Sequence, residues 1–272
     1  MIDERIDKEA EDFDLIALER FNNKQRPDIM GKWENNYYYN NIWRNSIYFN
    51  EEYGPIIDWI IDKLETNNIT NIAEFGCGTG WLTLHLARKG FNIIGYDISA
   101  KSIEIAQNYF QSIPNNNQLE LDYKKLNICD YDNYNGQSIL CFGFLHHLPN
   151  EVLQERINFI HNKMKPGQLL LVMEPRYDFV NFEMALLTQA LRMALPNHYS
   201  NNKDYKNIYH QTYNIYKELG ELDQNQSTLD NESPSELIVD TIKKYYDNVE
   251  IKYTTAFFDK FIGSLRLSDE DN

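Results

Sequence analysis

The sequence predicts an α/β fold, in which a mostly parallel sheet carries helices on both faces. The main observation is an alternation of short apolar runs and helical patterns between residues 71 and 175. Strands are predicted at 71–75, 91–96, 119–128, 138–142 and 168–173, and helices at 79–89, 99–112 and 150–164. Two further observations agree with it: a glycine-rich turn follows the first strand, and an acid ends the second.

The flanks of this alternation predict additional helices. Apolar positions at helical spacing indicate an amphipathic helix over 3–25, and Pro55 begins a second helix that runs to Leu64. Residues 178–195 and 235–247 are also helical in pattern, and 249–258 reads as a closing strand region. Four segments result: 1–65 as a helical and aromatic lid, 66–175 as the core, 176–234 as a helical insertion, and 235–272 as the end of the core.

Composition limits the classes of binding partner and the cellular compartment that we expect. The chain has 272 residues and a formal net charge of −15, which would repel a phosphate backbone and argues against nucleic acid. Its three cysteines have neither metal-ligand spacing nor an even number for pairing, as expected of reduced thiols. The acidic start is unlike a signal peptide, and no apolar run approaches a membrane span. We therefore expect a cytoplasmic protein without membrane contact.

The turn after the first strand is typical of a nucleotide site. Gly76, Gly78 and Gly80 let the backbone approach a ligand that side chains would exclude. A dinucleotide fingerprint, Gly-x-Gly-x-x-Gly, requires its third glycine where this chain has Trp81. The spacing therefore disfavours NAD. The second strand ends on Asp97, about twenty residues further on, where a carboxylate can accept both hydroxyls of a ribose.

Four ordered motifs resemble those of class I S-adenosylmethionine-dependent methyltransferases. They are Glu-x-Gly-x-Gly-x-Gly over residues 74–80, the acid Asp97, the turn at 126–130, and the segment 139–149 that contains His-His-Leu-Pro. The resemblance covers about residues 70–175. It implies S-adenosylmethionine as cofactor, S-adenosylhomocysteine as product, and a Rossmann-like sheet of seven strands with an antiparallel strand at one edge.

The same resemblance implies which residues bind the cofactor. Glu74 supports the glycine turn, and Ile98 follows the ribose acid. Asn127 and the Ile128 N–H lie where the family contacts adenine, although Asp130 takes that role in a different register. The cofactor's methionine carboxylate needs a cationic or N–H partner. Arg44 is our candidate, with a surface arginine stacked on Trp43 as the alternative.

Candidate catalytic residues follow the fourth and fifth strands. Methyl transfer from a sulfonium is an in-line displacement that needs alignment and exclusion of water, and a general base only where the acceptor must lose a proton. His146, or less favourably His147, can be that base or touch the acceptor, or pack as part of the turn before Pro149. Glu174 can bind an acceptor amine and Arg176 an anionic group. Alternatively, these two form a buried ion pair or a cap for the next helix.

The remaining aromatic and histidine residues say less about function. The aromatic group Trp33, Tyr37, Tyr38, Tyr39 and Trp43 can cage a cation or simply pack in a lid. Tyrosines at 205, 209, 213 and 216 form a stripe typical of core. His85, His161, His198 and His210 have no metal-ligand constellation, and no metal site is predicted.

The predicted function is methyl transfer to O or N of a small-molecule acceptor such as a natural product, a sugar or an amine. One alternative is a non-catalytic, methyltransferase-like subunit that binds cofactor without turnover. Another is an NAD-dependent oxidoreductase, which Trp81 disfavours. The sequence determines neither the acceptor nor the oligomeric state.

Overall fold

A computed structural model describes most of the predicted core. The described residues are 2–22, 26–29, 50, 53–131, 136–176, 182–194, 227–230 and 232–254. Arg44 and the aromatic group around it, the tyrosine stripe, and His198 and His210 lie outside these residues. Their predicted roles therefore stay predictions.

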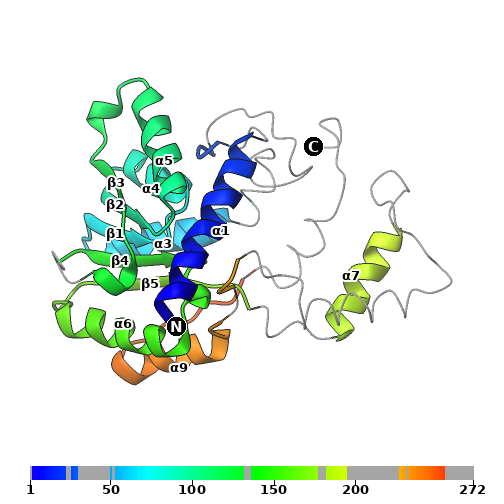
Figure 1. Cartoon of the computed structure of the whole chain (residues 1–272). Helices are drawn as coiled ribbons and strands as arrows, with labels where there is room; N and C mark the ends of the chain where they lie inside the picture. The colour runs from blue at the N-terminus through cyan, green and yellow to red at the C-terminus, as the bar shows by residue number, and fades with distance from the viewer. Residues whose placement is uncertain are drawn as a thin grey trace.

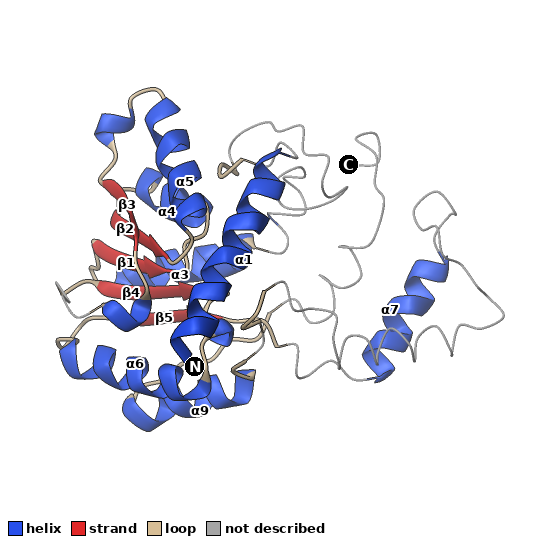
Figure 2. Ribbon diagram, viewed as in Figure 1, coloured by secondary structure: helices blue, strands red, loops and turns tan. Residues whose placement is uncertain are grey.

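The sheet has five parallel strands among the described residues. They are β1 (Asn71–Phe75), β2 (Asn92–Asp97), β3 (Leu121–Lys125), β4 (Ser138–Phe142) and β5 (Leu170–Met173), in the order β3-β2-β1-β4-β5 (Figure 2). The strand order reverses between β1 and β4, which is where open sheets of this kind bind ligands. Seven strands were expected. Residues 249–254, the described part of the predicted edge region, are not in a strand.

The helices lie close to their predicted positions. They are α1 (Ile2–Asn22), α3 (Gly54–Thr66), α4 (Trp81–Arg88), α5 (Ala100–Ser112), α6 (Asn150–Lys163), α7 (Phe182–Ala194) and α9 (Ser235–Tyr245) (Figure 1). Local chemistry explains two of the starts. Pro55 occupies the first turn of α3, and the Ser99 hydroxyl caps α5 by accepting the Ser102 N–H at 2.9 Å.

Alternating side chains of the strands build two core layers, one on each face of the sheet. Ile72 of β1 packs with α3 and α4, whereas Ala73 and Phe75 pack with α6 and with Ile238 of α9. Neighbouring strands keep this register, because Ile72 pairs with Ile93. Burial on both faces explains why the strands read as continuous apolar runs.

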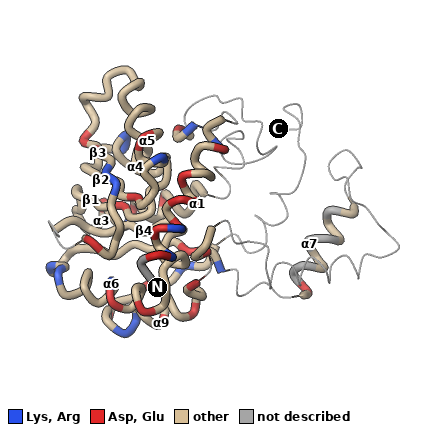
Figure 3. Tube along the Cα trace, in the orientation of Figure 1, with Lys and Arg blue, Asp and Glu red and all other residues tan. Residues whose placement is uncertain are grey.

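Helix α1 crosses the end of the sheet at which the strands terminate (Figure 1). Asp14 on this helix accepts hydrogen bonds from the Ser99 hydroxyl at 2.6 Å and from the Lys101 N–H at 2.8 Å, just beyond β2. Acidic residues recur along α1 (Figure 3). The N-terminal helix therefore lies across the carboxyl edge of the sheet. The predicted role of segment 1–65 as a lid over the acceptor stays a prediction.

Among the described residues, no helix is both long enough and apolar enough to cross a membrane.

Candidate functional site

The glycine turn after β1 has the backbone that only glycine adopts easily. Gly76, Gly78 and Gly80 have φ values of 69°, 53° and 85°. A Cβ atom at Gly76 would meet Phe144 at 2.6 Å, and one at Gly80 would meet Tyr123 at 2.3 Å. At Gly78 it would meet nothing within 4 Å. The outer glycines therefore permit close packing, whereas the middle one faces open space.

Asp97 links this turn to the end of β2. Its Oδ2 accepts the Gly78 N–H at 2.8 Å, and its Oδ1 accepts the Ser99 N–H at 2.8 Å. Burial raises the pKa of Asp97, and these two backbone hydrogen bonds act in the opposite direction. Each oxygen retains a second lone pair that can accept a ribose hydroxyl. Ile98, predicted beside the cofactor, lies directly beyond this acid and is half-buried.

Glu74 lies beneath the turn and is almost fully buried. Its Oε2 accepts a hydrogen bond from the Thr83 hydroxyl of α4 at 2.5 Å. Burial and the nearby charge of Asp97 raise the pKa of Glu74 to about 7, although the Thr83 hydrogen bond lowers it. The side chain joins β1 to α4 and so supports the turn from behind.

The predicted adenine contacts follow β3. The Leu126 N–H donates to the Asp97 carbonyl at 2.8 Å, which places the next residue, Asn127, beside the ribose acid. Asn127 Oδ1 accepts the Cys129 N–H at 2.9 Å and caps the 3₁₀ helix Ile128–Asp130, in which Ile128 is buried and Asp130 exposed. The amide nitrogen of Asn127 is the atom that remains to contact a base.

These residues fit a nucleoside cofactor. A turn with open space at its middle glycine, a carboxylate at the next strand end and an amide beyond the third strand lie along one edge of the sheet. The N-terminus of α4 follows the turn and adds a partial positive charge. The chain can therefore hold a ribose and a base along the carboxyl ends of β1, β2 and β3, next to the switch point between β1 and β4.

A second group of polar side chains is built around the loop after β4. Glu174, directly after β5, accepts the N–H groups of Phe144 at 2.9 Å and Leu145 at 2.7 Å through Oε1. Its Oε2 lies 2.6 Å from Nδ1 of His146. Glu174 therefore caps the 3₁₀ helix Leu145–His147, η3, and pairs with the histidine in it.

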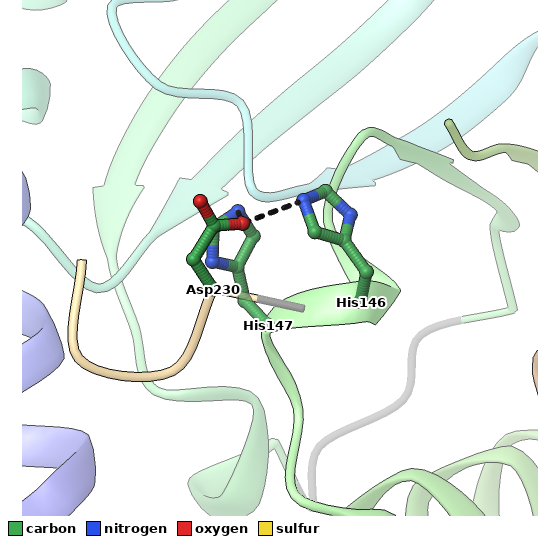
Figure 4. Close-up of side chains that lie close together, drawn as sticks. All are labelled: His146, His147 and Asp230. Carbon is green, nitrogen blue, oxygen red and sulfur yellow. Dashed lines mark ion pairs between the residues drawn. The ribbon is translucent and has the colours of Figure 1, made fainter. Parts of the chain in front are cut away.

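The other nitrogen of His146 faces an acid from a distant segment. Its Nε2 forms an ion pair with Oδ1 of Asp230 at 3.5 Å, and a dashed line marks this pair in Figure 4. Burial by itself lowers the pKa of His146, but hydrogen bonds to Asp230 and Glu174, with the charges of both, outweigh it and raise the pKa to about 9. When no metal cation is bound beside it, His146 is therefore charged at neutral pH. This state favours the interpretation in which His146 holds the loop, because a charged imidazole has no lone pair for a proton.

His147 repeats the pattern with a different acid. Its Nδ1 lies 2.9 Å from Oε1 of Glu9 on α1, and its Nε2 lies 4.0 Å from Oδ1 of Asp230. Glu9 also accepts the Ser227 hydroxyl and the Leu229 N–H, both at 2.6 Å. Sequence reasoning missed Glu9 and Asp230, because nothing in their spacing connects α1 or residue 230 to the loop after β4.

The two groups are in direct contact through Phe144. This residue packs against Gly76 of the glycine turn and immediately precedes the histidine-containing 3₁₀ helix. The Nε of Arg176 donates to the Ser235 hydroxyl at 3.3 Å, and its guanidinium lies 5.0 Å from the centre of the Tyr253 ring. Glu174 thus pairs with His146 and caps η3, an earlier helix than the one it was expected to cap, whereas Arg176 joins the core to α9.

Comparison with known proteins agrees with this site. Residues 47–218, well over half of the chain, match the family model described as a methyltransferase domain. A ubiquinone biosynthesis O-methyltransferase of Rickettsia typhi is 29% identical over 121 residues, which are 43% of this chain and 47% of that protein. An N-demethylindolmycin N-methyltransferase of Streptomyces griseus is 24% identical over 131 residues, 45% of this chain and 52% of that protein. The chain spans about half the length of these relatives.

Among solved structures, an S-adenosylmethionine-dependent methyltransferase from Clostridium acetobutylicum is 24% identical and has a TM-score of 0.40. The match covers 48% of this chain and 56% of that one. The match to the family model, over residues 47–218, is what assigns the chain. The chain belongs to the methyltransferase-domain family.

Proposed function

We propose that the protein transfers a methyl group from S-adenosylmethionine to an oxygen or nitrogen atom of a small-molecule acceptor. The observation that carries this proposal is the position of Asp97. This buried carboxylate accepts a hydrogen bond from the Gly78 N–H, and Gly78 belongs to a turn of three glycines with positive φ. Membership of the methyltransferase-domain family supports the reaction class.

In this proposal the cofactor lies along the carboxyl edge of the sheet. Asp97 accepts its ribose hydroxyls, Gly76, Gly78 and Gly80 give it backbone access, and Glu74 keeps the turn in place. Ile98, Asn127 and Ile128 surround the base, and Arg44 neutralises the methionine carboxylate. When bound, the cofactor supplies an electrophilic methyl group on a sulfonium.

His146 and Glu174 position the acceptor edge of the site. Glu174 holds the backbone of Phe144 and Leu145 and orients the His146 ring, so the loop keeps one conformation beside the glycine turn. Alignment and exclusion of water are the main requirements of methyl transfer. The roles of these two residues in turnover are therefore proposed to be positional.

A small acceptor agrees with the charge of the chain. The net charge of −15 opposes binding of a polyanion and suits a neutral or cationic molecule. The relatives include one named as an O-methyltransferase and one named as an N-methyltransferase. Either atom is therefore compatible with the proposal, within acceptors such as natural products, sugars and amines.

Calorimetric titration tests the cofactor assignment. The full chain is titrated with S-adenosylmethionine, S-adenosylhomocysteine and NAD, and the Asp97→Ala variant is compared with Asp122→Ala. Asp122 is an exposed acid on β3, so its loss controls for charge. We expect both adenosyl-sulfur ligands to bind the wild type and the Asp122→Ala variant with similar affinity. They should bind the Asp97→Ala variant at least tenfold more weakly. NAD should bind none of the three proteins.

Turnover is then measured as formation of S-adenosylhomocysteine with a panel of hydroxyl and amine acceptors. Product formation with a member of the panel supports the transferase. Cofactor binding without product formation with any acceptor favours the non-catalytic subunit, and binding of NAD alone would revive the oxidoreductase.

A further inference from the structure

Three side chains from two distant segments place metal-binding atoms together in the interior. His146 and His147 lie in η3, and Asp230 comes from the turn at 227–230 (Figure 4). One donor atom from each residue can be chosen so that all three lie within 4.8 Å of one another. The exposed fractions of these side chains are 10%, 12% and 2%. This is a buried group and not a chance gathering of surface acids.

The geometry of the donor atoms is close to that of a tetrahedral site. Oδ1 of Asp230 lies 3.5 Å from Nε2 of His146 and 4.0 Å from Nε2 of His147. Zinc bonds of about 2.0–2.1 Å would separate tetrahedral ligand atoms by about 3.4 Å. The first separation already agrees with this value, and the second needs to shorten by roughly half an ångström to reach it.

The opposite nitrogen of each ring is held by a different carboxylate. His146 Nδ1 lies 2.6 Å from Oε2 of Glu174, and His147 Nδ1 lies 2.9 Å from Oε1 of Glu9. Histidine ligands of metals almost always donate their second ring N–H to a carboxylate, a carbonyl or a water. Both histidines show this arrangement, and both direct the other nitrogen at the same carboxylate oxygen.

A metal cation between the rings and Asp230 fits this arrangement. When Nδ1 carries the proton that it donates to a carboxylate, Nε2 presents a lone pair. Two such lone pairs and a carboxylate oxygen converge here, among three buried acids, and like charges and lone pairs repel at these distances. A proton can occupy the shorter gap. The 4.0 Å separation is too long for a hydrogen bond but spans two metal bonds.

We propose that Nε2 of His146, Nε2 of His147 and a carboxylate oxygen of Asp230 bind one divalent transition-metal ion, with zinc as the favoured ion. Two imidazoles and one carboxylate suit zinc, whereas magnesium and calcium prefer oxygen ligands. Three protein ligands leave one position of a tetrahedral ion open, as in catalytic zinc sites. Binding of the ion does not require methyl transfer, so the two proposals can fail independently.

Zinc binding to the full chain tests the proposal directly. The protein is treated with a chelator, dialysed, titrated with zinc chloride and passed through a desalting column before metal analysis. We expect one zinc per wild-type chain. Asp230→Asn and His147→Gln should each bind zinc at least tenfold more weakly, and Glu9→Gln should weaken binding by about 10–100-fold through loss of the ring's second partner.

His161→Gln is the matched control, because His161 lies near the end of α6, packs against the rings of Tyr245 and Tyr246, and is not one of the three proposed ligands. This variant should keep one zinc per chain. Circular dichroism and binding of S-adenosylhomocysteine report whether each variant is folded. Absence of bound zinc in wild type, or equal binding in wild type, Asp230→Asn and His147→Gln, would overturn the proposal.

X-ray absorption at the zinc edge of the wild-type protein tests it without any substitution. The expected spectrum shows two imidazole ligands with oxygen completing the shell. A shell that contains sulfur, or oxygen alone, would place the ion elsewhere and reject this site.

Discussion

The glycine turn and the histidine loop lie side by side at one edge of the sheet, yet they are built in different ways. The turn, Glu74 and Asp97 come from one β-α-β unit, and their hydrogen bonds join residues that are near in sequence. The histidine loop depends on Glu9, Glu174 and Asp230, which arrive from three separate segments. The first region is therefore local and encoded by a motif, whereas the second exists only in the folded chain.

The largest expected effect separates two glycines of the turn. At Gly80, alanine combines a φ of 85° with a Cβ that meets the buried Tyr123, so we expect Gly80→Ala to lower the free energy of unfolding by about 4 kcal/mol. Gly78→Ala meets no atom within 4 Å, so only its backbone conformation costs stability, about 1 kcal/mol. Urea denaturation measures both.

The same pair distinguishes stability from binding. Since the Cβ of Gly78→Ala extends into open space at the proposed cofactor site, this variant should bind S-adenosylhomocysteine at least tenfold more weakly while it remains folded. Equal stability of the two variants would mean that Tyr123 moves aside freely.

The second effect is a pH dependence of the free energy of unfolding, which arises in the region of the glycine turn. In the folded chain the pKa of Glu74 is about 7, against 4.5 for the ordinary group, so the folded state keeps a proton that the unfolded state has lost between these values. The free energy of unfolding therefore falls as pH rises through this window and is level above it. The total change from this residue is about 3 kcal/mol.

Glu74→Gln replaces the protonated acid with a neutral amide that does not titrate. The fall in the free energy of unfolding with pH between 4.5 and 7 should therefore become less steep, by the amount that corresponds to about one proton. Urea denaturation across this range measures it. Glu120→Gln, at an exposed position, should keep the wild-type slope. A Glu74→Gln protein with the wild-type slope would assign the dependence to another buried acid.

The third effect concerns the assembled region alone. In Glu174→Gln an amide group replaces the carboxylate oxygen that faces His146, and we expect the free energy of unfolding to fall by about 2 kcal/mol. Affinity for S-adenosylhomocysteine should change less than threefold, since the glycine turn keeps its own hydrogen bonds. Glu155→Gln, an exposed acid of α6, is the control. A Glu174→Gln protein that folds but no longer binds the ligand would show that the two regions act as one.

The smallest effect concerns the helix that bridges both regions. Asp14→Ala removes the acceptor of the Ser99 and Lys101 hydrogen bonds, and we expect a loss of about 1 kcal/mol, comparable to the loss of a helix cap. Hydrogen exchange should then be faster in α1 and unchanged in β1. Glu11→Ala, on the exposed side of α1, should leave both rates as in wild type.

The contrast between the regions also explains what the sequence could predict. Strands buried on both faces give long apolar runs, so the parallel sheet and the positions of Gly78 and Asp97 followed from pattern and spacing. The strand predicted over 119–128 was too long. It ends at Lys125, because Asn127 caps a 3₁₀ turn, and this competition between side chain and backbone is not visible in hydropathy.

The partners of the histidines could not be predicted in the same way. The position of His146 and Glu174 after two neighbouring strands placed them at the same edge, and the structure brings them to 2.6 Å. The sequence cannot indicate that Glu9 and Asp230 complete the group, because such contacts depend on how α1 and the turn at 227–230 return to the sheet.

The hydrogen bond from Leu229 to Glu9 closes a loop of 220 residues. Contacts of such long sequence separation form late in folding, since the entropy of closing the loop must be overcome first. The glycine turn can form as soon as β1, α4 and β2 associate. We therefore expect a refolding chain to acquire its nucleotide turn before its histidine group, and an intermediate that binds cofactor ahead of metal would record that order.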